Sequence, residues 1–170
     1  MTEPMTKLKI VIAGDPAVGK TTLIKKFSTK KFEEDYKMTV GFQISKIEKI
    51  IGYDNVQFMV YDIAGQERFK IMRHRFYAGA DGCILVFDLT NKDSLKNIEM
   101  WYKECINLSE NSQVKLILVG NKHDLHRVVP REIGKKVADV IKVPYYETSA
   151  KNGLNVDEIF EELYHLVVKS

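Results

Sequence analysis

The sequence predicts one α/β domain built around a six-stranded, mostly parallel sheet. Runs rich in β-branched residues recur with helix-like patterns between them. The 170 residues, 45% of them hydrophobic, suit a single domain with one sizeable core. The expected strands lie at 7–13, 42–51, 56–63, 83–88, 115–119 and 145–147. About five helices are expected, at 19–28, 67–77, 94–108, 130–141 and 156–168.

Each element follows from its local pattern. The apolar run 8–13 gives the first strand, and a glycine-rich loop leads from it into the first helix. Only GYDN separates the second and third strands, which favours a hairpin and therefore one antiparallel edge strand. Trp101 and Tyr102 share a core-facing helical stripe with Ile98 and Cys105. Pro130 suits the first turn of the following helix, and EELYHLVVK is typical of a docked last helix.

Composition excludes several classes of protein. No stretch of about 18 apolar residues occurs and the start lacks a secretory core, so we expect a cytoplasmic chain. The net charge of +3 comes from lysines interleaved with acids, which argues against a nucleic-acid partner. Cys83 and Cys105 fit reduced core thiols. The four histidines share no metal-ligand spacing, so we expect them on the surface.

A phosphate-binding loop follows the first strand. The sequence GDPAVGKTT matches G-x-x-x-x-G-K-T between a strand and a helix, the context that the motif requires. Glycines allow the backbone to curl around a phosphate and to aim N–H groups at it, while the helix N-terminus adds favourable potential. Lys20 would reach the β- and γ-phosphates, and the Thr21 hydroxyl would ligate Mg²⁺. The fold expected is therefore that of P-loop nucleotide-binding proteins.

A second motif, YDIAGQE, ends the third strand. The Asp62 carboxylate would face Thr21 and hold Mg²⁺ directly or through a water, because Mg²⁺ bound to phosphates keeps several waters. Gly65 offers an N–H to a γ-phosphate, and the Gln66 amide can orient an attacking water.

The loops GNKHD and ETSAK follow the last two strands. Asp124 can accept two hydrogen bonds from the edge of guanine, whereas adenine would leave this carboxylate unpaired. The expected discrimination reaches about 10⁴ to 10⁵. Asn121 and Lys122 would brace the loop and cover the base, and the Ala150 N–H would meet the guanine oxygen.

Together these motifs resemble the Ras superfamily of small GTPases over nearly the whole chain, and the Rab group most of all. GDPAVGKTTLIKKF, TVGF, DIAGQERF, FYAGADGCILVFDLT, GNKHDL and ETSAK are all similar to Rab segments. The resemblance implies that Thr39 ligates Mg²⁺ in the GTP state, that Phe32 packs against guanine and that Tyr36 covers the phosphates.

The resemblance also implies a set of site residues. The residues expected to contact GTP or GDP are Asp15, Ala17, Val18, Gly19, Lys20, Thr21, Thr22, Phe32, Tyr36, Thr39, Gly65, Asn121, Lys122, Asp124, Leu125, Ser149, Ala150 and Lys151. The expected catalytic residues are Lys20, Thr39, Gly65 and Gln66, and the expected Mg²⁺ ligands are Thr21, Thr39 and Asp62. Residues 1–6 would be an N-terminal extension and residues 7–170 the GTPase domain.

Some positions depart from the Rab pattern. Tyr61 replaces the usual tryptophan before the metal aspartate, Ile44 replaces an effector-patch phenylalanine, and Phe76 alone keeps a ring at the third position. Pro16 stands where Ras relatives have glycine and Rabs often have serine. No cysteine tail is present, so a prenyl anchor cannot form on this sequence. Either the chain is trimmed, or it works without that anchor.

The expected activity is slow hydrolysis of GTP to GDP and phosphate by a molecular switch, with a role in membrane trafficking or related signalling. Expected partners are an exchange factor, an activating protein and effectors at residues 36–44 and 61–77, with contact to membranes only through partners or a missing tail. The chain is expected to be a monomer. Two alternatives remain: a binding module locked to its nucleotide, and an ATP-using phosphotransferase, against which Asp124 and the short connections speak.

Overall fold

Six strands form one sheet in the computed structural model, which describes residues 4–29 and 39–169. Their order is β2-β3-β1-β4-β5-β6, and every neighbouring pair is parallel except β2 with β3. The strands are β1 Met5–Ala13, β2 Phe42–Ile51, β3 Asp54–Ile63, β4 Gly82–Asp88, β5 Lys115–Asn121 and β6 Tyr145–Glu147. The predicted fold class is confirmed, and β1 begins two residues before the predicted start.

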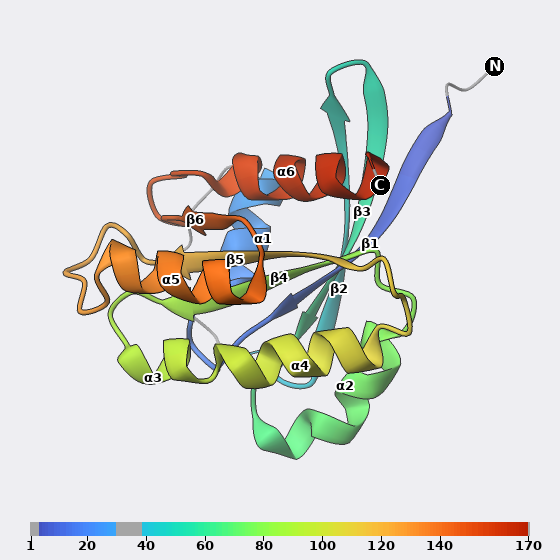
Figure 1. The fold of residues 1–170 in the computed structure, drawn as a ribbon. Coiled ribbons are helices and arrows are strands. Elements are labelled where there is room, and N and C mark those ends of the chain that lie inside the picture. The colour runs from blue at the N-terminus through green and yellow to red at the C-terminus, as the bar shows by residue number, and fades with distance from the viewer. Residues whose placement is uncertain (1–3, 30–38, 170) are drawn as a thin grey trace.

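The antiparallel edge is the predicted hairpin. Ile51 pairs with Asp54 across a two-residue turn in which Gly52 has a φ of 62°, a conformation that glycine adopts without a steric cost. The hairpin projects past α6 in Figure 1, and the N-terminal end of β1 extends beside it, with Met5 paired to Asn55.

The helices are α1 Lys20–Thr29, α2 Lys70–Tyr77, α3 Lys92–Lys96, α4 Ile98–Leu108, α5 Arg131–Ile141 and α6 Val156–Val168. A 3₁₀ turn, η1 Glu67–Phe69, precedes α2, so the predicted helix at 67–77 is α-helical only in its later part. The single helix predicted at 94–108 is wrong, because Asn97 divides it into α3 and α4. At this break the Asn97 side chain donates a hydrogen bond to Asp15, on the loop after β1.

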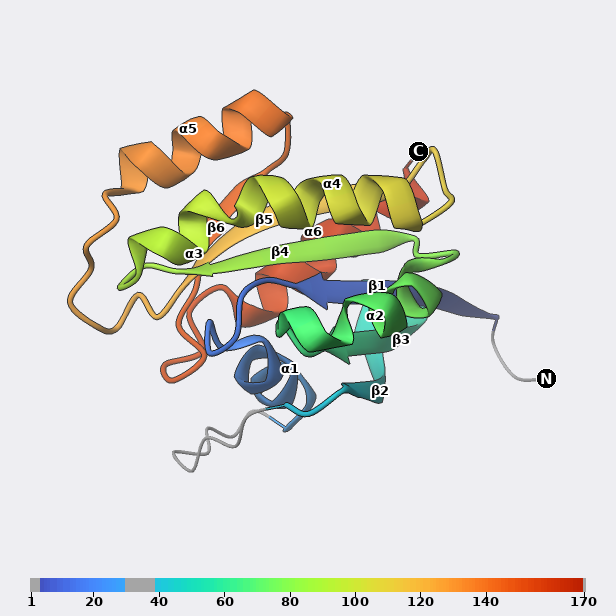
Figure 2. The same cartoon turned by 90° about the horizontal axis from the view of Figure 1, so that it is seen from below.

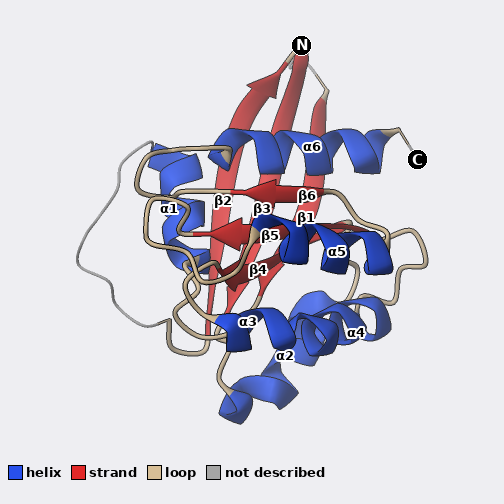
Figure 3. Ribbon diagram, turned by 60° about the vertical axis from the view of Figure 1, so that its left-hand side comes forward, coloured by secondary structure: helices blue, strands red, loops and turns tan. Residues whose placement is uncertain are grey.

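The helices cover both faces of the sheet (Figure 3). One apolar cluster joins the sheet to α1 and α6, where Phe27 and Phe160 stack with ring centroids 3.9 Å apart. The other cluster joins the opposite face to α2, α4 and α5, and includes Trp101 and Cys105. In Figure 1, α6 lies above the sheet and α3 and α4 lie below it. None of the helices in the described residues is long and apolar enough to span a bilayer.

Two expectations about side chains are confirmed. Cys83 and Cys105 are buried free thiols, on β4 and α4. The four histidines are all exposed, as predicted for surface residues; they are His74, His123, His126 and His165.

The parallel strands place the motif-bearing loops at one edge. β1, β3, β4, β5 and β6 all run the same way, so the loops that follow them meet beyond their carboxyl ends. Figure 2 shows β1 leading through its loop into α1 at that edge.

Candidate functional site

The phosphate loop connects β1 to α1 and is held by residues from β5. Gly19 has a φ of 100°, and a Cβ added there would lie 2.3 Å from Asn121 Nδ2, so only glycine fits. Asn121 is buried, and its Nδ2 donates to the main-chain oxygen of Val18 at 3.0 Å. Thr148 fixes the amide by donating to Asn121 Oδ1 at 2.9 Å. The loop after β6 thus orients the side chain that braces the phosphate loop.

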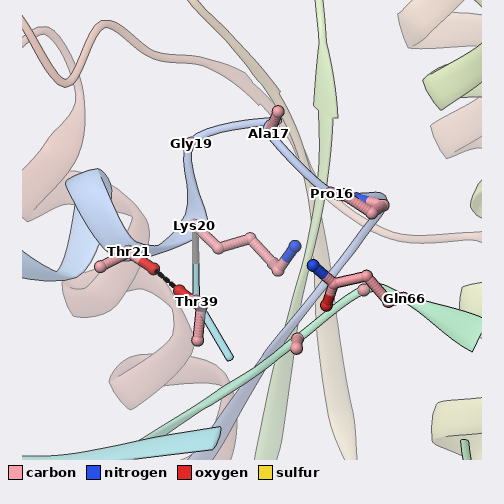
Figure 4. A pocket seen from close by; sticks show the side chains of 9 residues that line it. Pro16, Ala17, Gly19, Lys20, Thr21, Thr39 and Gln66 are labelled. Carbon is pink, nitrogen blue, oxygen red and sulfur yellow. Dashed lines mark hydrogen bonds between the residues drawn. The ribbon is translucent and has the colours of Figure 1, made fainter. Parts of the chain in front are cut away.

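Lys20 lies in the floor of a pocket that also contains Gln66 (Figure 4). Its side chain is buried, and Nζ donates to the carbonyl oxygens of Gly14 and Asp15, each at 2.8 Å. Burial lowers the pKa of the Lys20 ammonium to about 8, although Asp62 and Asp15 partly oppose this shift. The residues that line the pocket are Pro16, Ala17, Gly19, Lys20, Thr21, Thr39, Ala64, Gly65 and Gln66.

Three oxygen-bearing side chains converge beside Lys20. The hydroxyls of Thr21 and Thr39 lie 2.5 Å apart, and Thr21 also donates to Asp62 Oδ2. Asp62 is 1% exposed, and burial raises the pKa of its carboxyl, against the opposing effects of Thr21 and Lys20. These three residues come from α1, the segment before β2 and the end of β3.

The same cluster fits a small divalent cation. Asp62 Oδ1 is buried and has no hydrogen-bond partner among the described residues, so a buried carboxylate oxygen is free to bind. A carboxylate and two hydroxyls are oxygen donors of the kind that Mg²⁺ prefers. Within residues 4–29 and 39–169, no three His, Cys, Asp or Glu side chains gather closely enough to hold a metal ion by themselves.

The segment after β3 lies directly against the phosphate loop. A Cβ at Gly65 would lie 2.5 Å from Gly14 O and 2.7 Å from Pro16 N, so the two backbones touch here. Gln66 Oε1 is buried and finds no hydrogen-bond partner in the described part of the chain. The Gln66 amide and the Lys20 ammonium point toward each other across the pocket in Figure 4.

The predicted base-reading loops after β5 and β6 also meet. Lys122 has a φ of 69°, and its Nζ donates to Ala17 O at 2.7 Å and pairs with Asp88 at 2.8 Å. Asp124 is exposed, and its Oδ1 accepts a hydrogen bond from Ser149 Oγ at 2.7 Å. The carboxylate is therefore oriented and open to solvent. Ala150, which follows Ser149 in the sequence, is buried, whereas Leu125 and Lys151 are exposed.

An ion pair supports the loop after β6. Glu147 is 3% exposed and accepts two hydrogen bonds from Arg127, at 3.1 and 2.7 Å, and one from Tyr145 at 3.0 Å. Burial favours the neutral acid, but these hydrogen bonds outweigh it, so the pKa of Glu147 lies below its ordinary value.

The remaining predicted residues lie as follows. Val18 is buried and Thr22 is half-buried, both next to the phosphate loop. Asp15 turns its carboxylate away from the pocket toward α4, where Oδ1 accepts from Trp101 Nε1 at 2.8 Å. Phe32 and Tyr36 lie outside the described residues.

Sequence reasoning missed the polar role of α2 and α4. It assigned Trp101 to the core, and the ring is indeed 1% exposed, but its N–H is used on Asp15. It singled out neither Arg73, which is 1% exposed, nor Glu104, its partner at 2.7 Å. Helical periodicity marks a buried stripe but carries no signal for which loop a polar atom on that stripe will reach.

Aromatic side chains gather on the outer surface of β2, β3 and α2. The rings of Phe42 and Phe76 lie 4.3 Å apart, and Tyr61 lies 5.9 Å from Phe76. Phe42 and Ile44 are 45% and 43% exposed. Ile44 stands where the Rab effector patch has a phenylalanine, and Phe42, two residues earlier on β2, supplies an aromatic ring to the same patch.

A phosphate loop after β1, an oxygen cluster after β3 and an oriented Asp124 after β5, all on this sheet, define a P-loop protein of the small GTPase class. The model of the Ras family matches residues 9–169, so the chain belongs to the Ras family. It is a small GTPase, an enzyme that hydrolyses GTP, and it binds GTP and GDP.

The similar relatives are Rab-type proteins. Ras-related protein SEC4 of Saccharomyces cerevisiae is 39% identical, over 94% of this chain and 74% of that protein. Human Ras-related protein Rab-7b is 38% identical, over 92% of this chain and 80% of that protein. The Ypt/Rab-type GTPase YPT7 of Saccharomyces cerevisiae is 38% identical, over 92% and 79%. The predicted family and its Rab-like character are confirmed.

Proposed function

We propose that this small GTPase is a Mg²⁺-dependent switch of the Rab kind, with slow intrinsic hydrolysis and a role in membrane trafficking or related signalling. One observation carries the proposal. Thr21, Thr39 and Asp62 gather their oxygens on one side of Lys20, while Gln66 approaches Lys20 from the other. Lys20 and Gln66 would face a γ-phosphate bound in this pocket, and the three oxygens would hold the Mg²⁺ that accompanies it.

In the proposed mechanism the chain binds, orients and stabilises charge. Lys20 and the N–H groups of the loop hold the β- and γ-phosphates, and the Gly65 N–H approaches the γ-phosphate. Gln66 Oε1 accepts a hydrogen bond from a water in line with the bond to be broken. The water oxygen bonds to the γ-phosphorus as the bridge to the β-phosphate breaks, giving GDP and phosphate. Mg²⁺, when bound, supplies charge neutralisation at the phosphate oxygens.

Base choice is proposed to depend on Asp124. Ser149 holds one carboxylate oxygen, which leaves the carboxylate oriented toward the edge of a base. Guanine offers two donors there and adenine does not, so guanine nucleotides are preferred. Asn121 and Lys122 act indirectly, by joining this loop to the phosphate loop through Val18 O and Ala17 O.

Partners are proposed to act at the nucleotide-dependent segments 36–44 and 61–77. The exposed ring of Phe42, the half-buried ring of Phe76 and the 92% exposed Ile71 give this face the apolar character that suits effectors. No arginine is among the described residues that line the pocket, so we propose that an activating protein supplies one. Such an arginine accelerates hydrolysis by about 10³ to 10⁵. Contact with membranes would occur through partners or a lipidated tail, and the GTPase would be a monomer.

The nucleotide carried through purification tests the proposal. The purified protein is denatured, the released nucleotide is identified by chromatography, and turnover of pre-loaded GTP is followed with and without EDTA. We expect GDP or GTP, slow turnover, and faster nucleotide release in EDTA. Adenine nucleotides would favour a phosphotransferase, and retained GTP without turnover would favour a nucleotide-locked module.

A further inference from the structure

Arg73 of α2 is a buried cation with an unusual set of partners. Its side chain is 1% exposed, and burying a charge is costly unless that charge is paired. Nε donates to Glu104 Oε1 of α4 at 2.7 Å, and this carboxylate is itself 9% exposed. Nη1 donates to the main-chain oxygen of Gln66 at 3.0 Å. The guanidinium therefore neutralises a carboxylate with one edge and holds the backbone of Gln66 with the other.

The face of Arg73 rests on Trp101, which reaches the phosphate loop. The guanidinium carbon lies 4.7 Å from the Trp101 ring, within the range of a cation–π contact. Trp101 Nε1 donates to Asp15 Oδ1 at 2.8 Å, and Asn97 Nδ2 donates to Asp15 Oδ2 at 2.7 Å. A continuous chain of contacts thus runs from Asp15 through Trp101 and Arg73 to Gln66.

One face of α4 supplies this chain. Asn97 caps the start of α4, and Trp101 and Glu104 follow it at spacings of four and three residues, so the three side chains lie on the same side of the helix. Asn97 and Trp101 contact the phosphate loop directly. Glu104 holds Arg73 of α2, and Arg73 in turn contacts the segment after β3 at Gln66 O. Together with Arg73, this face therefore connects the two loops whose backbones touch at Gly65.

The bond to the Gln66 carbonyl limits how that residue can turn. Phe69 N also donates to Gln66 O, at 3.1 Å, so two donors fix the plane of the peptide that follows the Gln66 side chain. The amide end of Gln66 contributes a buried oxygen that has no partner among the described residues. The backbone is thus held while the amide is left available to a ligand.

We propose that Arg73 and Trp101 are positioning residues for GTP hydrolysis, which hold Gln66 in its working orientation by tying it through α4 to the phosphate loop. The proposal rests on the role proposed above for Gln66. The two residues act on hydrolysis through Gln66 and not through nucleotide affinity, since neither lines the described pocket.

Two substitutions break the chain at different links. Arg73→Lys keeps a positive charge opposite Glu104 but removes the planar fork that also reaches Gln66 O. Trp101→Phe keeps an aromatic ring beneath Arg73 but removes the N–H that binds Asp15, together with part of the buried ring volume. Matched controls on α4 are Lys103→Arg, an exposed cation paired with Glu99, and Tyr102→Phe, a half-buried neighbour.

The measurement is the single-turnover rate of GTP hydrolysis in pre-loaded protein, together with the GDP dissociation rate. Each substitution is tested alone and in a Gln66→Ala background. We expect Arg73→Lys and Trp101→Phe to slow hydrolysis about tenfold, the factor that loss of one hydrogen bond to a charged group supplies. GDP dissociation should stay within about twofold, and the controls should hydrolyse GTP at the wild-type rate. In the Gln66→Ala background, which is itself slow, neither substitution should slow hydrolysis further.

The results separate three outcomes. Wild-type hydrolysis in both variants, with Gln66→Ala slow, overturns the positioning inference alone. An equal further loss in the Gln66→Ala background overturns it as well, because the substitutions would then act through the fold. A wild-type rate in Gln66→Ala overturns the role of Gln66 and the inference with it. If Arg73→Lys fails to fold, Trp101→Phe carries the same test.

Discussion

Gly65→Ala tests whether the segment that carries Gln66 must lie against the phosphate loop during hydrolysis. The added methyl carbon would lie 2.5 Å from Gly14 O, 2.7 Å from Pro16 N and 2.8 Å from Asp15 C. All three are main-chain atoms, which cannot rotate away as the end of a side chain can. Gly65 does not have a left-handed φ, so the cost of alanine comes from this contact and not from backbone strain.

The size of the effect follows from that overlap. Relieving an overpacked contact costs about 1–3 kcal/mol, and here the simplest relief is to withdraw the segment from the loop. The close arrangement would become less populated by a factor of about 5 to 150. We expect single-turnover hydrolysis to fall by that factor, while GDP affinity changes little, because the bracing of the base-reading loop through Asn121 and Lys122 is untouched.

Phosphate release from GTP-loaded protein is the assay, with circular dichroism as a check on folding. Gly52→Ala is the matched control. Gly52 lies in the β2–β3 hairpin turn, far from the pocket, and a Cβ there would have no heavy atom within 4 Å, although its φ of 62° disfavours alanine. It should lower stability by about 1 kcal/mol and leave hydrolysis unchanged. Folded Gly65→Ala protein that hydrolyses GTP at the wild-type rate would refute the need for this close approach.

Three further predictions concern the base, the loop and acid stability. Asp124→Asn should weaken guanine binding and favour xanthine nucleotides, whose 2-position is a carbonyl; displacement of a fluorescent nucleotide measures this, and unchanged guanine affinity would exclude the base-reading role. Pro16→Gly should leave GTP affinity nearly unchanged but speed hydrolysis, most clearly with an activating protein, because the proline ring lines the pocket beside Gln66 and proline has no backbone N–H to offer a phosphate. If the variant and the wild-type protein hydrolyse GTP at the same single-turnover rate, both without and with the activator, this prediction is contradicted. Glu147→Gln should lose about 1.5–3 kcal/mol at pH 7, where the Arg127 bonds need a carboxylate. Because the folded pKa of Glu147 is depressed, its stabilisation is present above the unfolded pKa of about 4.5 and disappears as the pH falls through the folded value; urea unfolding across that range should show the two proteins converging in acid.

The sequence determined the fold class and the positions of the motifs. Strand runs such as 83–88 and the GYDN turn are local signals, and local signals were enough to predict the parallel sheet with one antiparallel edge. The motif residues follow strands, and parallel strands bring their carboxyl ends together whatever their separation in the chain. For this reason Lys20, Asp62 and Asp124 could be assigned to one edge of the molecule before its structure was described.

Only the tertiary structure decided how polar atoms on the helices are used. Asn97 was predicted to lie inside a helix and instead divides it, and Trp101 was predicted to be a core ring but also binds Asp15. Arg73 reaches Gln66 O from the next helix and rests on a ring that lies 28 positions further along the chain. Periodicity reports which face of a helix is buried. It does not report which loop packs there, because that depends on contacts between residues far apart in sequence, which form only when the sheet and its helices have assembled.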